Sequence, residues 1–378
     1  MSEQFTVIEA VARAETPLHI GDGRTTGIIK YTRPYIPGSV MRGSIGLLLK
    51  RVSCRLNDGE KHVEGEECAY HQLIEDEDGG QANAFFRYAY PLHIGCGGAF
   101  YPTPKTRSIC RNPQCNYSID DFSPPLDCPQ CKRTLRPAPR YECSKCGKGT
   151  DLPVSTFRAT MTSIDRDNST ASYVTDSEGE RRGTLHTLEL IETGAQFKVQ
   201  VLLNPNAEEH TPLMARLLEQ ALSDDGVGAA KSRGLGKLRT SSLTVTKVSP
   251  EIIQKRSDEL KDQMAMRLLS PMIVEKGEHL RIETLMEAAR RAYSQVFRRG
   301  KPGLKEPGLA AERFRFTTYG GWSLKENRRR RLSQAIEPGS TYQLVNVDTE
   351  LREALTALEQ CYAIGGFKTH GCGQILMK

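Results

Sequence analysis

The pattern of hydrophobic and polar positions predicts a mixture of strands and helices over most of the chain. Residues 5–14 are rich in β-branched side chains and partly alternate between apolar and polar positions, as a half-buried strand does. Residues 40–53 carry a leucine-rich face at helical spacing despite two internal glycines, and we place Ser39 as the N-cap. Further strand-like runs are 84–101, 156–164, 185–203, 241–248 and 341–347, and further helix-like runs are 207–223, 251–268, 281–298 and 349–362.

Two stretches depart from this pattern. Prolines, charged residues and six cysteines replace the apolar positions of 102–150, which indicates an insertion with its own fold. Thr, Ser, Asp, Asn and Gly dominate 165–182, a composition typical of an exposed hairpin or a disordered tip.

A glycine-rich basic loop occurs twice. Residues 226–238 contain the string Lys-Ser-Arg-Gly-Leu-Gly, and residues 365–375 overlay 228–238 at an offset of 137 as G-x-x-K-[ST]-[RH]-G-x-G. The free N–H groups of such a loop form a concavity for anionic oxygens, and the lysine and arginine within it favour phosphate. One such loop alone would fit a simple turn between a helix and a strand. Its repetition after a helix-like stretch indicates duplicated units and favours a binding site.

Composition adds less than the motifs do. With 378 residues, 38% apolar and 26% charged, the chain suits a globular protein of two or three domains. No run approaches the roughly 18 apolar residues of a membrane span, and the first residues lack the pattern of a signal peptide, so we expect a cytoplasmic protein. The net charge of +6 matters only because cations cluster at 231–239 and 328–331.

The cysteines predict metal. Six of the eleven fall into pairs: Cys110-x4-Cys115, Cys128-x2-Cys131 and Cys143-x2-Cys146. Two such pairs complete the tetrahedral thiolate set of a structural zinc ion, and the middle pair can combine with either neighbour. The stretch 102–150 has so few apolar residues that it could hardly fold without metal. We therefore expect one zinc ion, or two given six cysteines. A closed all-cysteine site leaves no position open for a substrate.

Several strings resemble the RAMP superfamily of CRISPR effector subunits. They are Pro-Leu-His-Ile-Gly-x-Gly at 17–23, Tyr-Ile-Pro-Gly-Ser-x-x-Arg-Gly at 35–43, and the two glycine loops. A fuller set resembles the two-domain RAMP subunit of type III-D effectors and covers most of 5–376. It adds Tyr101-Pro-Thr-Pro104, Thr162-Ser-Ile-Asp-Arg166, Gly321-Trp-Ser323 and Pro338-Gly-Ser340.

The resemblance implies an α+β fold with two ferredoxin-like (RRM-like) domains and a zinc-ribbon-like insertion. The first domain would comprise 1–101 and 151–245, the insertion 102–150 and the second domain 246–378. The chain would hold the backbone of a guide RNA near its 5′ handle, and through it meet target RNA and other effector subunits, with no membrane contact. The tract 165–182 would be the thumb that kinks RNA. The implied RNA contacts are Gly21, Gly23, Ser39, Arg42, Gly228, Lys231, Ser232, Arg233, Gly234, Gly236, Lys237, Lys368, His370, Gly371 and Gly373.

Departures from the family pattern bear on catalysis. Target-cleaving RAMP subunits carry an aspartate between the first glycine motif and Ile-Pro-Gly-Ser, whereas 24–35 contains no acid and Asp22 lies inside the glycine motif. We therefore predict a scaffold and assign no catalytic residue. His370 stands where the first loop has Arg233, and an ordinary histidine pKa of about 6.5 makes the second loop the weaker contact at pH 7.5. The alternatives are an RNA endonuclease using His19 or Asp22, and a zinc-ribbon module that binds protein or DNA.

Overall fold

The first ferredoxin-like domain is a four-stranded antiparallel sheet covered on one face by two helices. The computed structural model describes residues 4–56, 60, 68–75, 82–162, 164–165, 167–168, 170–175, 181–183, 185–297, 303–323 and 328–378. The elements of this domain are β1 (Phe5–Ala14), α1 (Gly38–Ser53), β4 (Ala84–Phe86), β17 (Gln196–Leu203), α2 (Thr211–Ser223) and β18 (Leu238–Val248). In the sheet the strands follow the order β18-β1-β17-β4. This is the fourth, first, third and second strand of a βαββαβ unit, the ferredoxin arrangement.

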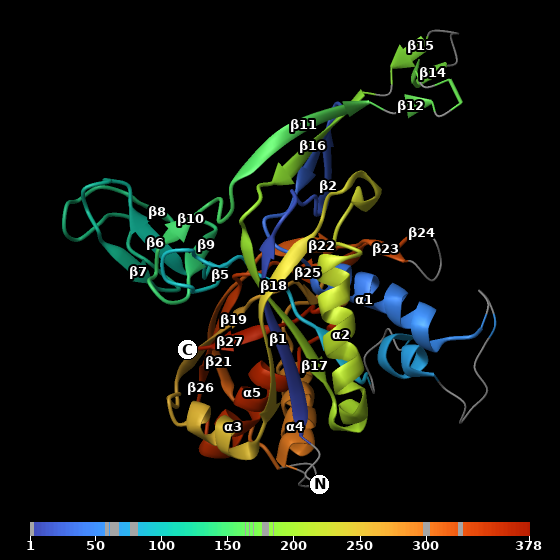
Figure 1. The fold of residues 1–378 in the computed structure, drawn as a ribbon. Coiled ribbons are helices and arrows are strands. Elements are labelled where there is room, and N and C mark those ends of the chain that lie inside the picture. Colours follow the sequence, from blue (N-terminus) through green and yellow to red (C-terminus); the bar gives the residue numbers. More distant parts are fainter. Residues whose placement is uncertain are drawn as a thin grey trace.

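Alternation along β1 gives the sheet two buried faces. Ile8, Ala10 and Ala12 point into a core shared with α1 and α2. Phe5 and the partly buried Val7 point the other way, into the core of the second domain. Because successive side chains of a strand face opposite sides, one strand can supply both cores. The first sheet therefore lies between its own helices and the second domain, as Figure 1 shows.

The second domain repeats the same topology. Its elements are β19 (Met264–Leu268), α4 (Ile282–Phe297), β21 (Gly308–Arg313), β26 (Thr341–Val345), α5 (Thr349–Cys361) and β27 (Ile375–Met377). The strand order β21-β26-β19-β27 is again second, third, first, fourth. The expected α+β class with two ferredoxin-like domains is confirmed.

One expected helix is wrong in its second half. Only α3 (Pro250–Ser257) is helical in the stretch 251–268, and Met264–Leu268 forms β19. Met264, Met266 and Leu268 are buried there, and the backbone pairs with β26 on one side and β27 on the other. A short apolar run is ambiguous in sequence, and the two neighbouring strands decide its conformation.

A second sheet of the first domain projects from the body of the molecule. It contains β2 (Gly21–Thr26), β3 (Ile29–Thr32), β11 (Thr156–Thr162) and β16 (Leu185–Ile191) in the order β11-β16-β3-β2. Figure 1 shows β11 and β16 extending away from the helices toward the short strands beyond them. Those are β12 (Ile164–Asp165), β13 (Thr170–Ala171), β14 (Tyr173–Thr175) and β15 (Arg181–Gly183). The expected thumb, 165–182, lies partly outside the described residues.

The insertion is built from short strands around cysteine turns. One three-stranded sheet contains β6 (Arg107–Cys110), β7 (Ser118–Asp120) and β8 (Leu135–Pro137), and another contains β5 (Phe100–Pro102), β9 (Tyr141–Cys143) and β10 (Gly149–Thr150). This is the expected ribbon-like insertion. It lies to one side of the body in Figure 1 and contacts the second domain, where Lys105 N–H donates to the Gly339 carbonyl at 2.7 Å.

The remaining elements are small. They are a π-helical turn (His71–Glu75), three 3₁₀ turns (Pro205–His210, Lys231–Arg233 and Lys368–His370), and β20 (Met272–Ile273), β22 (Phe316–Tyr319), β23 (Trp322–Ser323), β24 (Arg328–Arg329) and β25 (Ser333–Ile336). Among the residues that the structure describes, no helix is both long and apolar enough to span a bilayer. β18 ends at Val248.

Candidate nucleic-acid interface and metal centres

The first glycine loop (226–238) has a backbone fixed by left-handed residues. Lys231–Arg233 forms one turn of 3₁₀ helix between Ala230 (φ 59°) and Gly234 (φ 80°). The N–H groups of Ala229 and Gly236 donate to the carbonyls of His19 (2.9 Å) and Pro17 (3.0 Å), which ties the loop to the first domain. Gly228 and Gly236 also have positive φ, a conformation that glycine adopts without strain.

The side chains of this loop face solvent. Ser232, Arg233 and Lys237 are exposed and Lys231 is half-buried. The Arg233 guanidinium reaches the projecting sheet, where its Nη1 donates to His186 Nε2 at 2.7 Å and lies 3.3 Å from Met161 Sδ. Met161 and His186 pair with each other near the outer end of β11 and β16, so the loop lies against the projecting sheet. Its exposed cations remain accessible to a ligand. The sequence gives no indication of this role for His186, because no motif surrounds that residue.

The motif containing Gly21 and Gly23 begins strand β2 beside this loop. Asp22 forms an ion pair with Arg24, and Arg33 Nη2 donates to the Asp22 carbonyl at 3.3 Å. His19 is buried, with 4% of its surface exposed, and its Nδ1 donates to the Glu189 carbonyl at 2.8 Å. Since a carbonyl can only accept, the hydrogen of neutral His19 is on Nδ1. The imidazole thus connects β16 to the glycine motif.

The second glycine loop (365–375) has the same backbone. Lys368–His370 is a 3₁₀ turn between Phe367 (φ 51°) and Gly371 (φ 79°). The N–H of Gly373 donates to the Pro271 carbonyl at 2.8 Å, as that of Gly236 does to Pro17. The duplication that the sequence indicates is therefore repeated in the backbone of both loops.

The surroundings of the second loop differ, and they correct the expectation for His370. Thr369 and His370 are 1% and 2% exposed, because the loop packs against the first domain. A Cβ on Gly371 would lie 2.4 Å from the Phe86 carbonyl oxygen, and a Cβ on Gly38 would lie 2.6 Å from that of His370. Burial, followed by the charges of Arg42 and Arg330, lowers the pKa of His370 to about 2. This imidazole is neutral and enclosed, so a phosphate at the surface cannot reach it.

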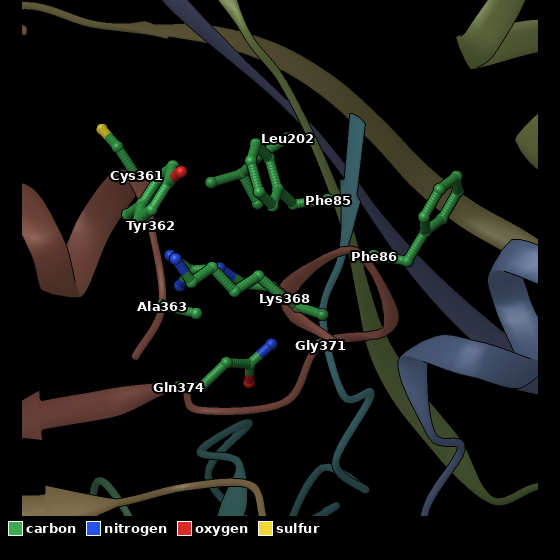
Figure 2. A pocket seen from close by; sticks show the side chains of 10 residues that line it. Phe85, Phe86, Leu202, Cys361, Tyr362, Ala363, Lys368, Gly371 and Gln374 are labelled. Atoms are coloured by element: carbon green, nitrogen blue, oxygen red, sulfur yellow. The ribbon is translucent and has the colours of Figure 1, made fainter. Parts of the chain in front are cut away.

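Lys368 points into the same interdomain contact. Figure 2 shows its side chain beside Tyr362 and Ala363 in a small pocket, and Nζ lies 4.8 Å from the centre of the Tyr362 ring. Burial, with the Arg291 charge adding to it, lowers the pKa of Lys368 to about 8. The second loop thus joins the two domains, and neither of its basic residues is presented at the surface as Arg233 is.

The start of α1 is covered by this loop. The helix begins at Gly38 with Pro37 at the N-cap position, so the expected cap at Ser39 is wrong. Proline suits a helix start because it lacks an N–H to satisfy. Arg42 is 8% exposed and its Nη2 donates to the Ile74 carbonyl. The helix start and Arg42, which the resemblance offers to RNA, contact protein instead.

The structure separates the six paired cysteines into two clusters. Cys110, Cys115, Cys128 and Cys131 form what we call the four-cysteine cluster, with their Sγ atoms all within 4.8 Å of one another. Cys110 Sγ lies 3.3 Å from Cys131 Sγ, and Cys115 Sγ lies 3.7 Å from Cys128 Sγ. This is one of the two quartets that the spacing allows. The other quartet, Cys128 and Cys131 with Cys143 and Cys146, is wrong.

Cys143 and Cys146 instead meet two residues from outside the expected insertion. His93 Nδ1 lies 3.3 Å from both Cys96 Sγ and Cys146 Sγ, and Cys96 Sγ lies 3.3 Å from Cys143 Sγ. We call this set the histidine–cysteine cluster. His93 and Cys96 are absent from the predicted ligands, although His93-x2-Cys96 has the same spacing as Cys128-x2-Cys131 and Cys143-x2-Cys146. The signal was hidden because the pair precedes Cys143 by almost fifty positions.

Comparison with known proteins gives a family. The model of the RAMP superfamily matches residues 11–239, which is more than half of the chain. No curated protein matches in sequence.

Three solved structures resemble the chain distantly. "Cryo-EM structure of the Type III-B Cmr-beta bound to cognate target RNA" contains a chain with 14% identity and a TM-score of 0.35, covering 65% of this chain and 62% of that one. The same complex with target RNA and AMPPnP, state 1, gives 10% identity, a TM-score of 0.40 and coverages of 90% and 86%. A chain in the apo state of the same complex has 14% identity and a TM-score of 0.32, and the match covers 62% of this chain and 97% of that one. The chain thus spans less than two thirds of the first of these relatives.

Proposed function

This chain belongs to the RAMP superfamily, and we propose that it is a guide-RNA-binding structural subunit of a type III CRISPR interference complex. The observation that carries the proposal is the first glycine loop, whose 3₁₀ turn presents Ser232 and Arg233 at the surface beside the half-buried Lys231. Such a loop grips phosphates through N–H groups and cations without reading bases. A subunit that accepts guides of any spacer sequence requires this kind of contact.

The projecting sheet extends this surface. Arg24 and Arg158 lie over the ring of Tyr31, at 5.4 and 6.0 Å from its centre. Both arginines are exposed, and Lys30 on the same strand as Tyr31 is exposed too. Cations interleaved with an aromatic ring suit single-stranded RNA, which offers phosphates and unstacked bases. We assign the guide contact to the first domain, 1–101 and 151–245, and propose that 246–378 supports it and meets other subunits.

The geometry favours a scaffold over a nuclease. A general acid–base must reach the ribose hydroxyl whose proton it takes. His19 is buried against Glu189, and the carboxylate of Asp22 is paired with Arg24, so both candidates of the endonuclease alternative are engaged in structural contacts. We therefore propose RNA binding without cleavage, in the cytoplasm, where guide and target RNA meet.

We assign zinc to the four-cysteine cluster. Its four thiolates come from two turns and lie at mutual distances that suit one tetrahedral ion. Zinc would cross-link β6 to the turn at 128–131 and replace the apolar core that this sheet lacks. Cys110 and Cys128 are buried, as ligands of a closed structural site are.

The decisive experiment incubates the full chain with labelled RNA that carries a repeat-derived handle and one of two unrelated spacers. We expect binding of both RNAs with similar affinity, and intact RNA with or without added Mg²⁺. Arg233→Ala should weaken binding by about 1.5–3 kcal/mol, the range for a hydrogen bond to a charged group. Lys255→Ala, an exposed lysine on the distant α3, is the matched control and should bind as wild type.

Three other outcomes of this experiment would contradict the proposal. Cleaved RNA would favour the endonuclease alternative, and absence of binding would favour a zinc-ribbon module with other partners. Wild-type affinity in Arg233→Ala would show that the first glycine loop is not the site.

A further inference from the structure

Two short turns face each other where the insertion leaves the first domain. In one, the N–H groups of Cys96 and Gly97 donate to the His93 carbonyl at 3.1 and 2.7 Å. In the other, the N–H of Gly147 donates to the Cys143 carbonyl at 2.9 Å. Each turn presents two ligand side chains from its first and fourth residues, the form that metal-binding C-x2-C turns take.

The approach of the two turns depends on Gly98. A Cβ at this position would lie 2.6 Å from Cys143 Sγ and 2.9 Å from the backbone nitrogen of Lys145, closer than real Cβ atoms come to other atoms. Only glycine lets the second turn close over the first. The result is that the four donor atoms of His93, Cys96, Cys143 and Cys146 lie within 4.8 Å of one another.

We propose that these four residues bind a second zinc ion, and that this ion joins the insertion to both domains. In a tetrahedral site with metal–sulfur bonds of about 2.3 Å, the ligand atoms are about 3.8 Å apart. The contacts of 3.3 Å in this cluster are close to that separation. A disulfide between Cys96 and Cys143 would use only half of the set and leave the converging His93 and Cys146 without a role.

The first domain supplies one half of the site directly. Leu92, next to His93, donates its N–H to the carbonyl of Gln196, the first residue of β17, at 2.7 Å. The His93 ring packs against Phe100 of β5, with centres 5.2 Å apart. The turn that carries His93 and Cys96 is therefore attached to β17 of the first domain.

The insertion supplies the other half and connects it to the second domain. Cys143 ends β9, and the preceding residue, Glu142, accepts from Arg267 Nη1 of β19 at 2.8 Å. Both side chains of this pair are nine-tenths buried or more, at 9% and 3% exposed. Arg107 and Lys378 also face Glu142, each at 3.5 Å.

Because Glu142 and Cys143 are neighbours on one strand, an ion that fixes Cys143 also fixes the carboxylate that Arg267 needs. An Arg267 left without this partner would be a buried unpaired charge. The ion in the histidine–cysteine cluster thus maintains an interdomain contact. The four-cysteine cluster differs, since its ligands all lie within or beside the sheet β7-β6-β8.

The test uses the full chain purified without added metal, with zinc measured by elemental analysis. We expect two zinc ions per wild-type chain and one in Cys146→Ser, whose cysteine is exposed and therefore the ligand least involved in packing. Cys115→Ser, the matched ligand variant of the four-cysteine cluster, should also retain one. His93→Cys should retain two because it keeps four donors, and Cys54→Ser is the control outside both clusters.

Hydrogen exchange then separates the two sites. Amides of β9 and β19 should exchange about tenfold faster in Cys146→Ser, equivalent to about 1.4 kcal/mol of local stability. In Cys115→Ser they should exchange as in wild type, with the change confined to β6, β7 and β8. If Cys146→Ser fails to fold, Co²⁺ binding to the wild type still tests the second site. We expect two bound Co²⁺ ions with different absorption spectra, because one cluster has four thiolates and the other has three thiolates and an imidazole.

Three results would overturn the inference. One is a single zinc in the wild type that Cys115→Ser abolishes. Another is a Cys96–Cys143 disulfide found in the protein by mass spectrometry under non-reducing conditions. The third is wild-type exchange of β19 in a Cys146→Ser protein that has lost one zinc, which would leave a metal site without the interdomain role.

Discussion

At the scale of single residues, burial converts a potential cation into a neutral structural group. Tyr319 Oη lies 3.4 Å from His370 Nδ1, and the Phe367 ring stacks on the imidazole with centres 5.3 Å apart. The ring is only 2% exposed, so a charged imidazole would lose the hydration that it has in water. A histidine in place of the exposed Arg233 would instead be surrounded by solvent, where its charged form is hydrated. Sequence cannot distinguish these cases because the loops share one pattern.

The low pKa of His370 makes stability depend on pH. The unfolded chain binds a proton at this residue below its ordinary pKa of about 6.5, whereas the folded protein does so only near pH 2. Stability contributed by His370 is therefore complete above pH 6.5 and falls below it, by about 1.4 kcal/mol between pH 7.5 and 5.5. His370→Gln should lack this component. Urea unfolding of both proteins at both pH values measures it, and an identical pH dependence would contradict the enclosed, neutral histidine.

At the scale of elements, strong periodic patterns predicted the structure well. The strand 5–14 and the helices 281–298 and 349–362 occur close to their expected limits, and a ribbon-like insertion is present. The failures have a common cause, since each depends on a partner far away in the chain. Residues 264–268 form strand β19 because they pair with β26 and β27. The histidine–cysteine cluster needs His93 and Cys96, which lie on a turn outside the expected insertion. The second loop is buried by Phe86 and Gly38, which precede it by about 280 positions or more.

Equivalent glycines in the two loops provide a matched comparison. Gly234 and Gly371 both have φ near 80°, but a Cβ on Gly234 would meet nothing within 4 Å, whereas one on Gly371 would meet the Phe86 carbonyl oxygen at 2.4 Å. Gly234→Ala should therefore cost about 1–2 kcal/mol for the left-handed backbone alone. Gly371→Ala should cost about 1–3 kcal/mol more for overpacking of the interdomain contact. Chemical denaturation of both variants checks this order, and equal losses would mean that the second loop does not pack against β4.

At the scale of the whole molecule, the two repeated domains have glycine loops in different surroundings. Both keep the ferredoxin strand order and the glycine loop, yet only the first loop presents cations to solvent. The second loop, together with the face of the first sheet that carries Phe5, holds the domains together. A repeat in sequence therefore predicted the shared backbone, while the function of each copy follows from what packs against it. The proposed RNA-binding surface is consequently on one side, beside the projecting sheet.

A one-sided surface makes a quantitative prediction for salt. For a single-stranded RNA, each phosphate neutralised by the protein contributes a slope of about −0.7 to log K against log salt concentration. Removing one phosphate contact with Arg233→Ala should make the slope shallower by about 0.7, whichever spacer the RNA carries. Lys255→Ala should leave it unchanged, because α3 lies at the opposite end of the molecule from β11 and β16 in Figure 1. Titrations at several salt concentrations give all three slopes. An unchanged slope in Arg233→Ala would mean that its guanidinium meets no phosphate, and an equal change in Lys255→Ala would mean that the RNA is attracted by overall charge and not by the first glycine loop.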